Sequence, residues 1–248
     1  MTNPKIIAES GILLVDKPED WTSHDVVNCV RRRFRVKKVG HCGTLDPKAT
    51  GLLVLVLGRA TKLSAQLSGQ DKWYTGTMRL GETTTTQDRE GDVVATASCD
   101  TLTDAQVDAV FAKFTGELEQ LPPMVSAVKK NGKPLYKLAR KGIEVEREPR
   151  TIYIHEFQPT SICIPDVNFD LHCSKGTYVR TLCEDVGREL GCGAHLYALR
   201  RIQSGQFHVD DSVTTDTIKT WEREQLLSHL IPLQKVLASL TDGEDQSF

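Results

Sequence analysis

Residues 40–51 have the sequence GHCGTLDPKATG, and the chain continues directly into the apolar run Leu52–Leu57. The glycines and the Asp-Pro step predict that residues 40–50 form a loop. The six apolar residues that follow, ending at Gly58, are short enough for a strand that is buried on both faces. A buried helical segment would have the same pattern, so both interpretations stay open. In either case the loop is held against a rigid, buried element, as reactive side chains often are.

Asp46 is the only acidic residue between residues 29 and 62, and two interpretations fit it. An aspartate before proline in a glycine-rich turn usually accepts hydrogen bonds that shape the turn. A carboxylate in a loop can also be a catalytic group. Composition by itself favours the turn interpretation.

The segments around this loop alternate between helical and strand-like patterns. Thr22-Ser23 offers an N-cap, and the apolar residues that follow recur at helical spacing, which predicts a helix over residues 24–34. Other predicted strands cover residues 11–16, 72–80, 92–97, 151–157 and 167–173, with 92–97 as the partner of 72–80. Other predicted helices follow Thr103, end at Gly191 and occupy parts of residues 214–240. This interleaving without strict β-α-β order predicts a mixed α/β or α+β fold.

The net charge of −2 conceals a segregated distribution. Residues 29–62 hold nine Lys or Arg against one Asp, a balance of +8, and residues 129–150 hold eight against three Glu, a balance of +5. Two such segments on a near-neutral chain are typical of a surface that binds phosphate, so the pattern favours a nucleic-acid partner. The alternative is that they are ordinary solvated faces.

Other signals are notable for their absence from the sequence. Seven cysteines occur without a CxxC pair, and the first residues lack the pattern of an export signal. These features predict reduced thiols, a cytoplasmic location and no structural metal. No apolar stretch is long enough to span a membrane. No P-loop, GxGxxG or serine-centred elbow occurs, so no cofactor is expected.

The segment around Asp46 strongly resembles the catalytic motif of the TruB family of tRNA pseudouridine synthases. Further segments resemble family motifs in family order across roughly residues 11–205: Leu14–Pro18, Asp71–Tyr74, Pro123–Ala127 with Leu135-Tyr136, Cys173–Arg180 and Gly193–Arg201. The resemblance implies a pseudouridine synthase fold, in which helices and loops flank a central mixed, mostly antiparallel sheet. It also implies a thumb-like insert near residues 122–150. The implied activity is isomerisation of uridine to pseudouridine at position 55, in the T-loop of tRNA.

The resemblance also implies the catalytic roles. Asp46 becomes the nucleophile that holds an intermediate while the glycosidic bond is rearranged. Arg180 becomes its cationic partner, which opposes the rise in carboxylate pKa that burial under a base would cause. Tyr74 becomes the residue that stacks on the flipped uracil and a candidate to remove the proton from C5.

Substrate contacts follow from the same resemblance. His41 would occupy the space vacated by the flipped base, and Tyr178 and Leu199 would line the uracil pocket. Three further residues fall on family-like positions, in a supporting layer or at the RNA backbone: Lys17, Lys62 and Asp88. The expected partner is the T-arm of tRNA, with no membrane and no small-molecule cofactor, and the chain is expected to be a monomer.

The resemblance predicts a catalytic domain over residues 1–212 and a C-terminal helical extension over residues 213–248 with a frayed acidic end. Many bacterial relatives continue into a small RNA-binding PUA domain, which is not expected here.

Two other functions remain open. One is the same chemistry on other RNAs with T-loop-like hairpins. The other is tRNA binding or folding with incidental catalysis.

Overall fold

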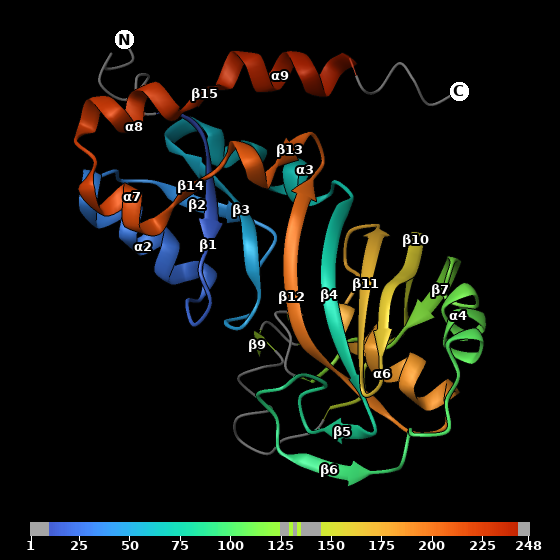
Figure 1. Cartoon of the computed structure of the whole chain (residues 1–248). Helices are drawn as coiled ribbons and strands as arrows, with labels where there is room; N and C mark the ends of the chain where they lie inside the picture. The colour runs from blue at the N-terminus through green and yellow to red at the C-terminus, as the bar shows by residue number, and fades with distance from the viewer. Residues whose placement is uncertain (1–9, 125–128, 131–132, 135–144, 243–248) are drawn as a thin grey trace. The chain divides into compact units, whose positions relative to one another are not determined.

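The computed structural model describes residues 10–124, 129–130, 133–134 and 145–242. Most of the predicted thumb-like insert and the acidic end of the chain lie outside these residues. The chain forms two compact units (Figure 1), one made of residues 1–70 and 200–248 and the other of residues 71–199. No helix among the described residues is long and apolar enough to cross a membrane.

The first unit is a sheet covered by short helices. Its elements are β1 (Gly11–Lys17), α2 (Ser23–Phe34), β2 (Val39–Cys42), β3 (Thr50–Leu57), η1 (Gly58–Leu63), α3 (Ser64–Ser68), the end of β12 (Ala194–Ser204), β13 (Phe207–His208), η2 (Val209–Asp211), β14 (Val213–Thr214), α7 (Thr215–Thr220), α8 (Arg223–His229), β15 (Ile231–Pro232) and α9 (Leu233–Asp242). β1 and β3 are antiparallel, and β14 runs parallel to β1. β2 pairs with the end of β3, and β12 runs parallel to its start.

β3 is a strand, as one of the two interpretations of residues 52–57 predicts. Leu53, Leu55 and Leu57 face one hydrophobic cluster, which includes the apolar side of α2. Leu52, Val54 and Val56 face a second cluster on the other side. Because both faces are buried, the strand needs apolar side chains at every position, and this explains the uninterrupted run.

α2 begins where the sequence predicts. The Thr22 side chain accepts a hydrogen bond from the Asp25 backbone N–H, and the Asp25 carboxylate accepts one from the Thr22 backbone, which forms a capping box. Val26, Val27 and Val30 are buried, whereas Arg32 and Arg33 are exposed. The outer face of this helix is therefore basic.

Among the described residues, the second unit contains an antiparallel sheet and the two helices α4 and α6. Its elements are the start of β12, β4 (Lys72–Leu80), β5 (Glu82–Thr84), β6 (Val93–Thr96), α4 (Asp104–Ala112), β7 (Gly116–Gln120), β8 (Lys129–Lys130), β9 (Lys133–Pro134), β10 (Arg150–Cys163), β11 (Asp166–Cys173) and α6 (Val179–Glu189). β4 pairs with β11, β11 with β10, and β10 with β7, all antiparallel. With the parallel pairs of the first unit, this confirms the predicted mixed, mostly antiparallel sheet structure.

One predicted strand pairing is wrong. β6, within the predicted strand 92–97, pairs with β5 instead of β4. Gly81 adopts a φ of +87°, which turns the chain out of β4 and starts a separate hairpin. β4 instead receives β11, a strand that follows it by more than eighty residues and whose apolar face fits the core of the unit.

Candidate active site

The loop that carries Asp46 connects β2 to β3 in the first unit and is anchored from the start of α2. The Ser23 side chain is buried, donates a hydrogen bond to the Leu45 carbonyl at 3.1 Å and accepts one from the Leu45 backbone N–H at 2.9 Å. The Ala49 backbone N–H donates to the Asp46 carbonyl at 3.1 Å. Asp46 itself is partly exposed. These contacts fix the backbone of the loop, which holds the Asp46 carboxylate at the surface of the unit.

Lys17 lies fully buried beneath this loop. Its ammonium donates to three backbone carbonyls: those of Pro18 at 2.9 Å, Trp21 at 2.6 Å and Pro47 at 2.9 Å. An ammonium has three N–H donors, so these bonds use its full capacity. Burial lowers the pKa of Lys17 from 10.5 to about 8, and the negative charge of Asp46 gives the largest opposing effect. Lys17 therefore fixes the residue next to Asp46 and places a positive charge near the carboxylate.

Replacing Lys17 with methionine is expected to destabilise the protein by about 2 kcal/mol or more, because carbonyl groups lose their charged donor. The loss should depend on pH. The pKa of Lys17 is about 8 in the folded chain, against 10.5 for a lysine side chain in water. Between these values the unfolded chain binds more protons, so the stability of wild type relative to Lys17→Met should rise with pH, by at most about 1.4 kcal/mol per unit. Urea unfolding of both proteins at pH 7 and pH 9.5 measures this, and parallel pH profiles would contradict it.

Arg201 anchors the other side of the loop. It is buried, donates from Nε to the Leu52 carbonyl at 2.7 Å, and donates from Nη2 to the Gly43 carbonyl at 3.0 Å. Its backbone pairs with Gly51, whose φ is +96°. A Cβ on Gly51 would lie 2.3 Å from the Arg201 carbonyl oxygen. The glycine that ends the loop motif is therefore required by the close approach of β12.

Gly51→Ala is expected to destabilise the protein by more than about 2 kcal/mol, because it combines a strained φ with a backbone clash. Gly116→Ala is the matched control. Gly116 has a φ of +94°, but a Cβ added there would meet nothing within 4 Å, so only the strain of the left-handed conformation remains. Urea unfolding of the two variants separates the effects, and equal losses would show that the contact with β12 contributes nothing.

His41 and Lys62 have different surroundings in the first unit. His41 lies on β2 and is half-buried. Burial, and then the charges of Arg201 and His24, lower the pKa of His41, so its imidazole is neutral at pH 7. Lys62 lies in η1 and is exposed, so its charge is available to a ligand such as a phosphate.

In the second unit, Arg180 and Asp88 form a buried ion pair. Arg180 Nη1 lies 3.2 Å from Asp88 Oδ2 and 3.3 Å from the Thr86 carbonyl oxygen. Asp88 Oδ1 accepts hydrogen bonds from the Thr86 hydroxyl at 2.5 Å and from the Glu90 backbone N–H at 3.0 Å. Asp88 is thus held from two sides and in turn orients the guanidinium of Arg180 at the start of α6.

The three residues predicted at the uracil pocket also lie in the second unit. Tyr74, on β4, and Leu199, on β12, are half-buried and pack against the core cluster of the unit. Tyr178 precedes α6. Its backbone N–H donates to Gln120 Oε1 at 2.8 Å, and its carbonyl accepts from Gln120 Nε2 at 3.1 Å. This two-way contact holds the backbone of Tyr178 against β7.

The structure thus brings together some of the predicted residues. Lys17 lies close enough to Asp46 for a mutual electrostatic effect, and Arg180 pairs with Asp88. Asp46 and Arg180 belong to different units, so their pairing stays a prediction. The motifs assign no role to Arg201 or Gln120. Arg201 lies in the family-like segment Gly193–Arg201, which is a usable signal, whereas nothing in the sequence around Gln120 indicates its contact.

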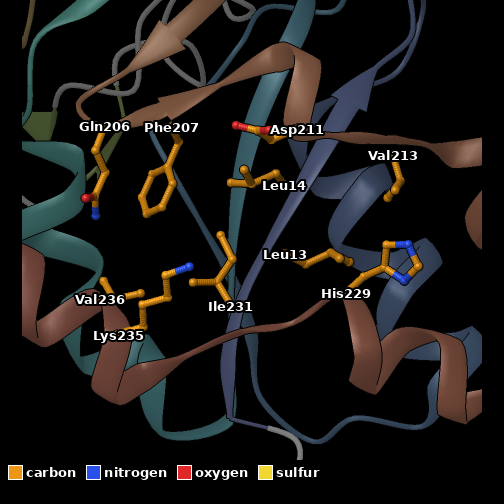
Figure 2. Close-up of a pocket in the computed structure, with 10 residues that line it drawn as sticks. All are labelled: Leu13, Leu14, Gln206, Phe207, Asp211, Val213, His229, Ile231, Lys235 and Val236. Atoms are coloured by element: carbon orange, nitrogen blue, oxygen red, sulfur yellow. The ribbon is translucent and has the colours of Figure 1, made fainter.

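A separate pocket of about 390 Å³ lies in the first unit (Figure 2). Leu13 and Leu14 of β1 form part of its apolar wall, and Asp211 and Lys235 contribute charged groups. None of the residues predicted for the site lines it. This pocket therefore does not bear on the predicted chemistry.

Comparisons with known proteins agree with the motifs. Residues 31–179 match the family model of the TruB family pseudouridylate synthase N-terminal domain. Residues 180–238 match the family model of the tRNA pseudouridylate synthase B C-terminal domain. The tRNA pseudouridine synthase B of Opitutus terrae is 48% identical over 93% of this chain and 95% of its own length. That of Syntrophotalea carbinolica is 49% identical over 92% of this chain and 74% of its own.

Solved structures are similar as well. A chain of a Cbf5-Nop10-Gar1 complex matches with a TM-score of 0.72 and 29% identity, over 95% of this chain and 67% of that chain. A chain of an H/ACA RNP bound to a substrate RNA containing 2'-deoxyuridine matches with a TM-score of 0.68 and 26% identity, over 95% and 66%. Family models, relatives and fold agree: the chain belongs to the TruB family of pseudouridylate synthases.

Proposed function

We propose that this chain isomerises the uridine at position 55 in the T-loop of tRNA to pseudouridine, with Asp46 as the nucleophile. The observation that carries the proposal is the anchored loop: in a chain of this family, the loop that carries a partly exposed carboxylate is bound through its backbone carbonyls by buried Lys17 and buried Arg201. The bond from N1 to C1′ breaks, the uracil rotates, and C5 bonds to C1′. A proton leaves C5 and N1 gains one, so nothing is consumed and no cofactor is required.

Asp46 must be ionised to attack the nucleotide. Two features support this state. The ammonium of Lys17 lies nearby, and residues 29–62 are basic apart from Asp46. Arg180 is proposed to supply the direct cationic partner when a base covers the carboxylate and removes water from it. Its pairing with Asp88 supports this role, because an already oriented guanidinium loses less freedom on binding the nucleophile.

The remaining residues are proposed to receive the flipped base. Extruding a stacked base costs about a few kcal/mol, and stacking on an aromatic ring returns about 1–3 kcal/mol. Tyr74 is proposed as the stacking ring and as the group that removes the C5 proton, with Tyr178 and Leu199 beside it. His41 is proposed to fill the space left in the RNA. Its neutral imidazole suits that role, since a charged ring would cost more to insert among bases.

The T-arm of tRNA is the proposed partner, and the chain is proposed to act as a cytoplasmic monomer without a cofactor. The exposed arginines of α2 and the exposed Lys62 are proposed to contact phosphates. The names of the similar proteins support tRNA as the class of substrate.

The test uses three RNAs with the purified chain: a tRNA transcript, its isolated T-arm hairpin, and the same hairpin with the loop sequence scrambled. Pseudouridine is mapped at single-nucleotide resolution. Modification of the first two at position 55, and not of the third, is expected. Equal modification of the scrambled hairpin would favour isomerisation of other RNAs. Tight binding of all three without modification would favour the RNA-binding function.

A further inference from the structure

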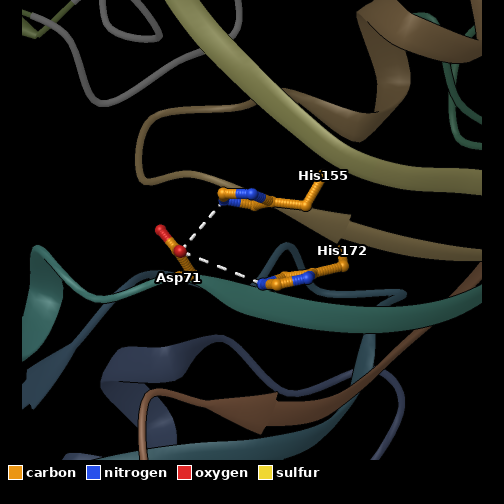
Figure 3. Close-up of side chains that lie close together, drawn as sticks. All are labelled: Asp71, His155 and His172. Carbon is orange, nitrogen blue, oxygen red and sulfur yellow. Dashed lines mark ion pairs between the residues drawn. The ribbon is translucent and has the colours of Figure 1, made fainter. Parts of the chain in front are cut away.

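Three metal-ligand side chains converge on one face of the second unit, apart from the residues predicted for the active site. Asp71 precedes β4, His155 lies on β10 and His172 lies on β11. His155 Nε2 is 3.0 Å and His172 Nε2 is 3.9 Å from the same Asp71 oxygen, and one ligand atom from each of the three residues lies within 4.8 Å of the others (Figure 3). We propose that this triad binds a divalent transition-metal ion of the Zn²⁺ class.

The two histidines lie on the same face because His155 follows Ile154 on β10 and His172 precedes Cys173 on β11, and Ile154 and Cys173 are a directly opposed pair in the core. Ile154 pairs with Cys173 and Glu156 pairs with His172, so the register shifts by one residue at His155. In a bulge, two residues of one strand oppose a single residue of the partner. His155 and Glu156 thus both oppose His172, while Ile154 and Cys173 remain in the core.

His172 has an imidazole nitrogen suited to coordination. Its Nε2 is excluded from solvent and has no hydrogen-bond partner among the described residues. A buried polar atom without a partner is costly, and a bound cation would satisfy it. Trp73 stacks on the His172 ring at 3.8 Å between centroids and 13° between planes, which orients it.

The three ligand atoms lie within 4.8 Å of one another and must draw together by at most about 1.3–1.5 Å to bind a tetrahedral metal ion. Zn–N distances of about 2.0–2.1 Å in a tetrahedral site place ligand atoms about 3.3–3.5 Å apart. The pair Asp71–His155 is already closer than that range, and the pair Asp71–His172 must shorten by about half an ångström. The two imidazoles are stacked at 4.2 Å between centroids and 27° between planes, so they must turn toward each other to direct both nitrogens at one ion. The side chains of Asp71 and His155 are 40% and 34% exposed, so water can complete the coordination. Two imidazoles and one carboxylate suit Zn²⁺ better than Mg²⁺ or Ca²⁺.

The proposed metal site is separate from the residues that are proposed to carry out isomerisation. Successive side chains of a strand point to opposite faces, so Trp73 and Tyr74 of β4 face different sides of the sheet. Tyr74 packs against the core cluster, whereas Trp73 packs on His172. Metal binding can therefore be measured without reference to isomerisation. Asp71, His155 and His172 follow no recognisable sequence spacing, so the absence of a CxxC pair led to the expectation of no structural metal.

The experiment titrates Zn²⁺ into the chelator-treated full chain by calorimetry, with circular dichroism to confirm folding. The variants are His172→Gln, His155→Gln and Asp71→Asn. The controls are His229→Gln, which changes a histidine on α8, and Cys163→Ser, which removes an exposed thiol. One equivalent of Zn²⁺ is expected for wild type and both controls, and at least about tenfold weaker binding for each ligand variant. A hundredfold excess of Zn²⁺ over its dissociation constant is expected to raise the Tm of wild type by about 5 °C or more.

A second readout does not depend on any variant. Co²⁺ in place of Zn²⁺ is expected to give visible absorption typical of nitrogen and oxygen ligands, without a thiolate charge-transfer band. The proposal is overturned if wild type binds no Zn²⁺ at millimolar concentration, which would leave a simple His155–Asp71 ion pair. It is also overturned if His172→Gln and Asp71→Asn bind as tightly as wild type, or if Cys163→Ser abolishes binding.

Discussion

Replacing Asp46 with asparagine is expected to lower the single-turnover rate of isomerisation by about 10⁴-fold or more, while the affinity for tRNA changes little. Asparagine has the same shape, and the loop is held by backbone contacts from Ser23, Lys17 and Arg201, so the fold should be preserved. The amide carries no negative charge and cannot form the covalent intermediate. Filter binding and a single-turnover assay with uridine-labelled tRNA measure the two quantities.

The matched control is Asp216→Asn, which changes an exposed aspartate in the first turn of α7. It removes the same charge from the same unit and should leave the rate within about twofold, as for surface substitutions in general. A rate loss of similar size in both variants would point to a general electrostatic effect on RNA approach. Pseudouridine formed by Asp46→Asn at the wild-type rate would rule out Asp46 as the nucleophile.

Arg180→Met is expected to lower the isomerisation rate by about 10³-fold with little change in tRNA affinity. The reason is that methionine has a comparable chain length but cannot support an ionised carboxylate under a bound base. It also leaves Asp88 as a buried charge without its cation, so stability should fall by about 3–5 kcal/mol. Urea unfolding and the single-turnover assay are needed together, because lower stability by itself can lower activity.

A double variant separates the two effects. Asp88→Asn added to Arg180→Met removes the unpaired charge and should restore part of the lost stability. The isomerisation rate should stay low, because the guanidinium is still absent. If the double variant recovers the rate as well as the stability, Arg180 acts only through folding. If tRNA affinity falls in step with the rate, Arg180 is a phosphate contact.

Contacts between residues that are close in the sequence made much of the secondary structure predictable. The capping box at Thr22 and Asp25 is a contact within one helical turn, so the sequence reveals it. β3 could be predicted only as one of two structures, because burial on both faces removes the alternation that separates strand from helix. The pairing of β6 was predicted wrongly because strands β4 and β11 meet across a long stretch of chain, and the turn at Gly81 that frees β6 depends on backbone geometry.

Some features of the candidate site can likewise be predicted from the sequence, and others cannot. Motif resemblance points to Asp46, Tyr74 and Arg180 as candidate residues, because their identities are tied to short segments. It could not reveal that Lys17 uses all three of its donors on carbonyls beneath the loop, or that Asp88 holds Arg180. The contacts of Lys17 with Pro47 and of Arg180 with Asp88 join residues that are 30 and 92 positions apart and depend on how the strands are packed.

The sequence by itself determined the family, the carboxylate loop with its basic surroundings, and most helices and strands, since these depend on neighbouring residues and on short motifs. The tertiary structure alone decided why Gly51 must be glycine and where His155 and His172 meet Asp71. Both depend on strand register: the parallel pairing of β12 with β3 brings Arg201 against Gly51, and the pairing of Ile154 with Cys173 puts two distant histidines on the same face. Register is set by packing across the sheet, which no local pattern contains.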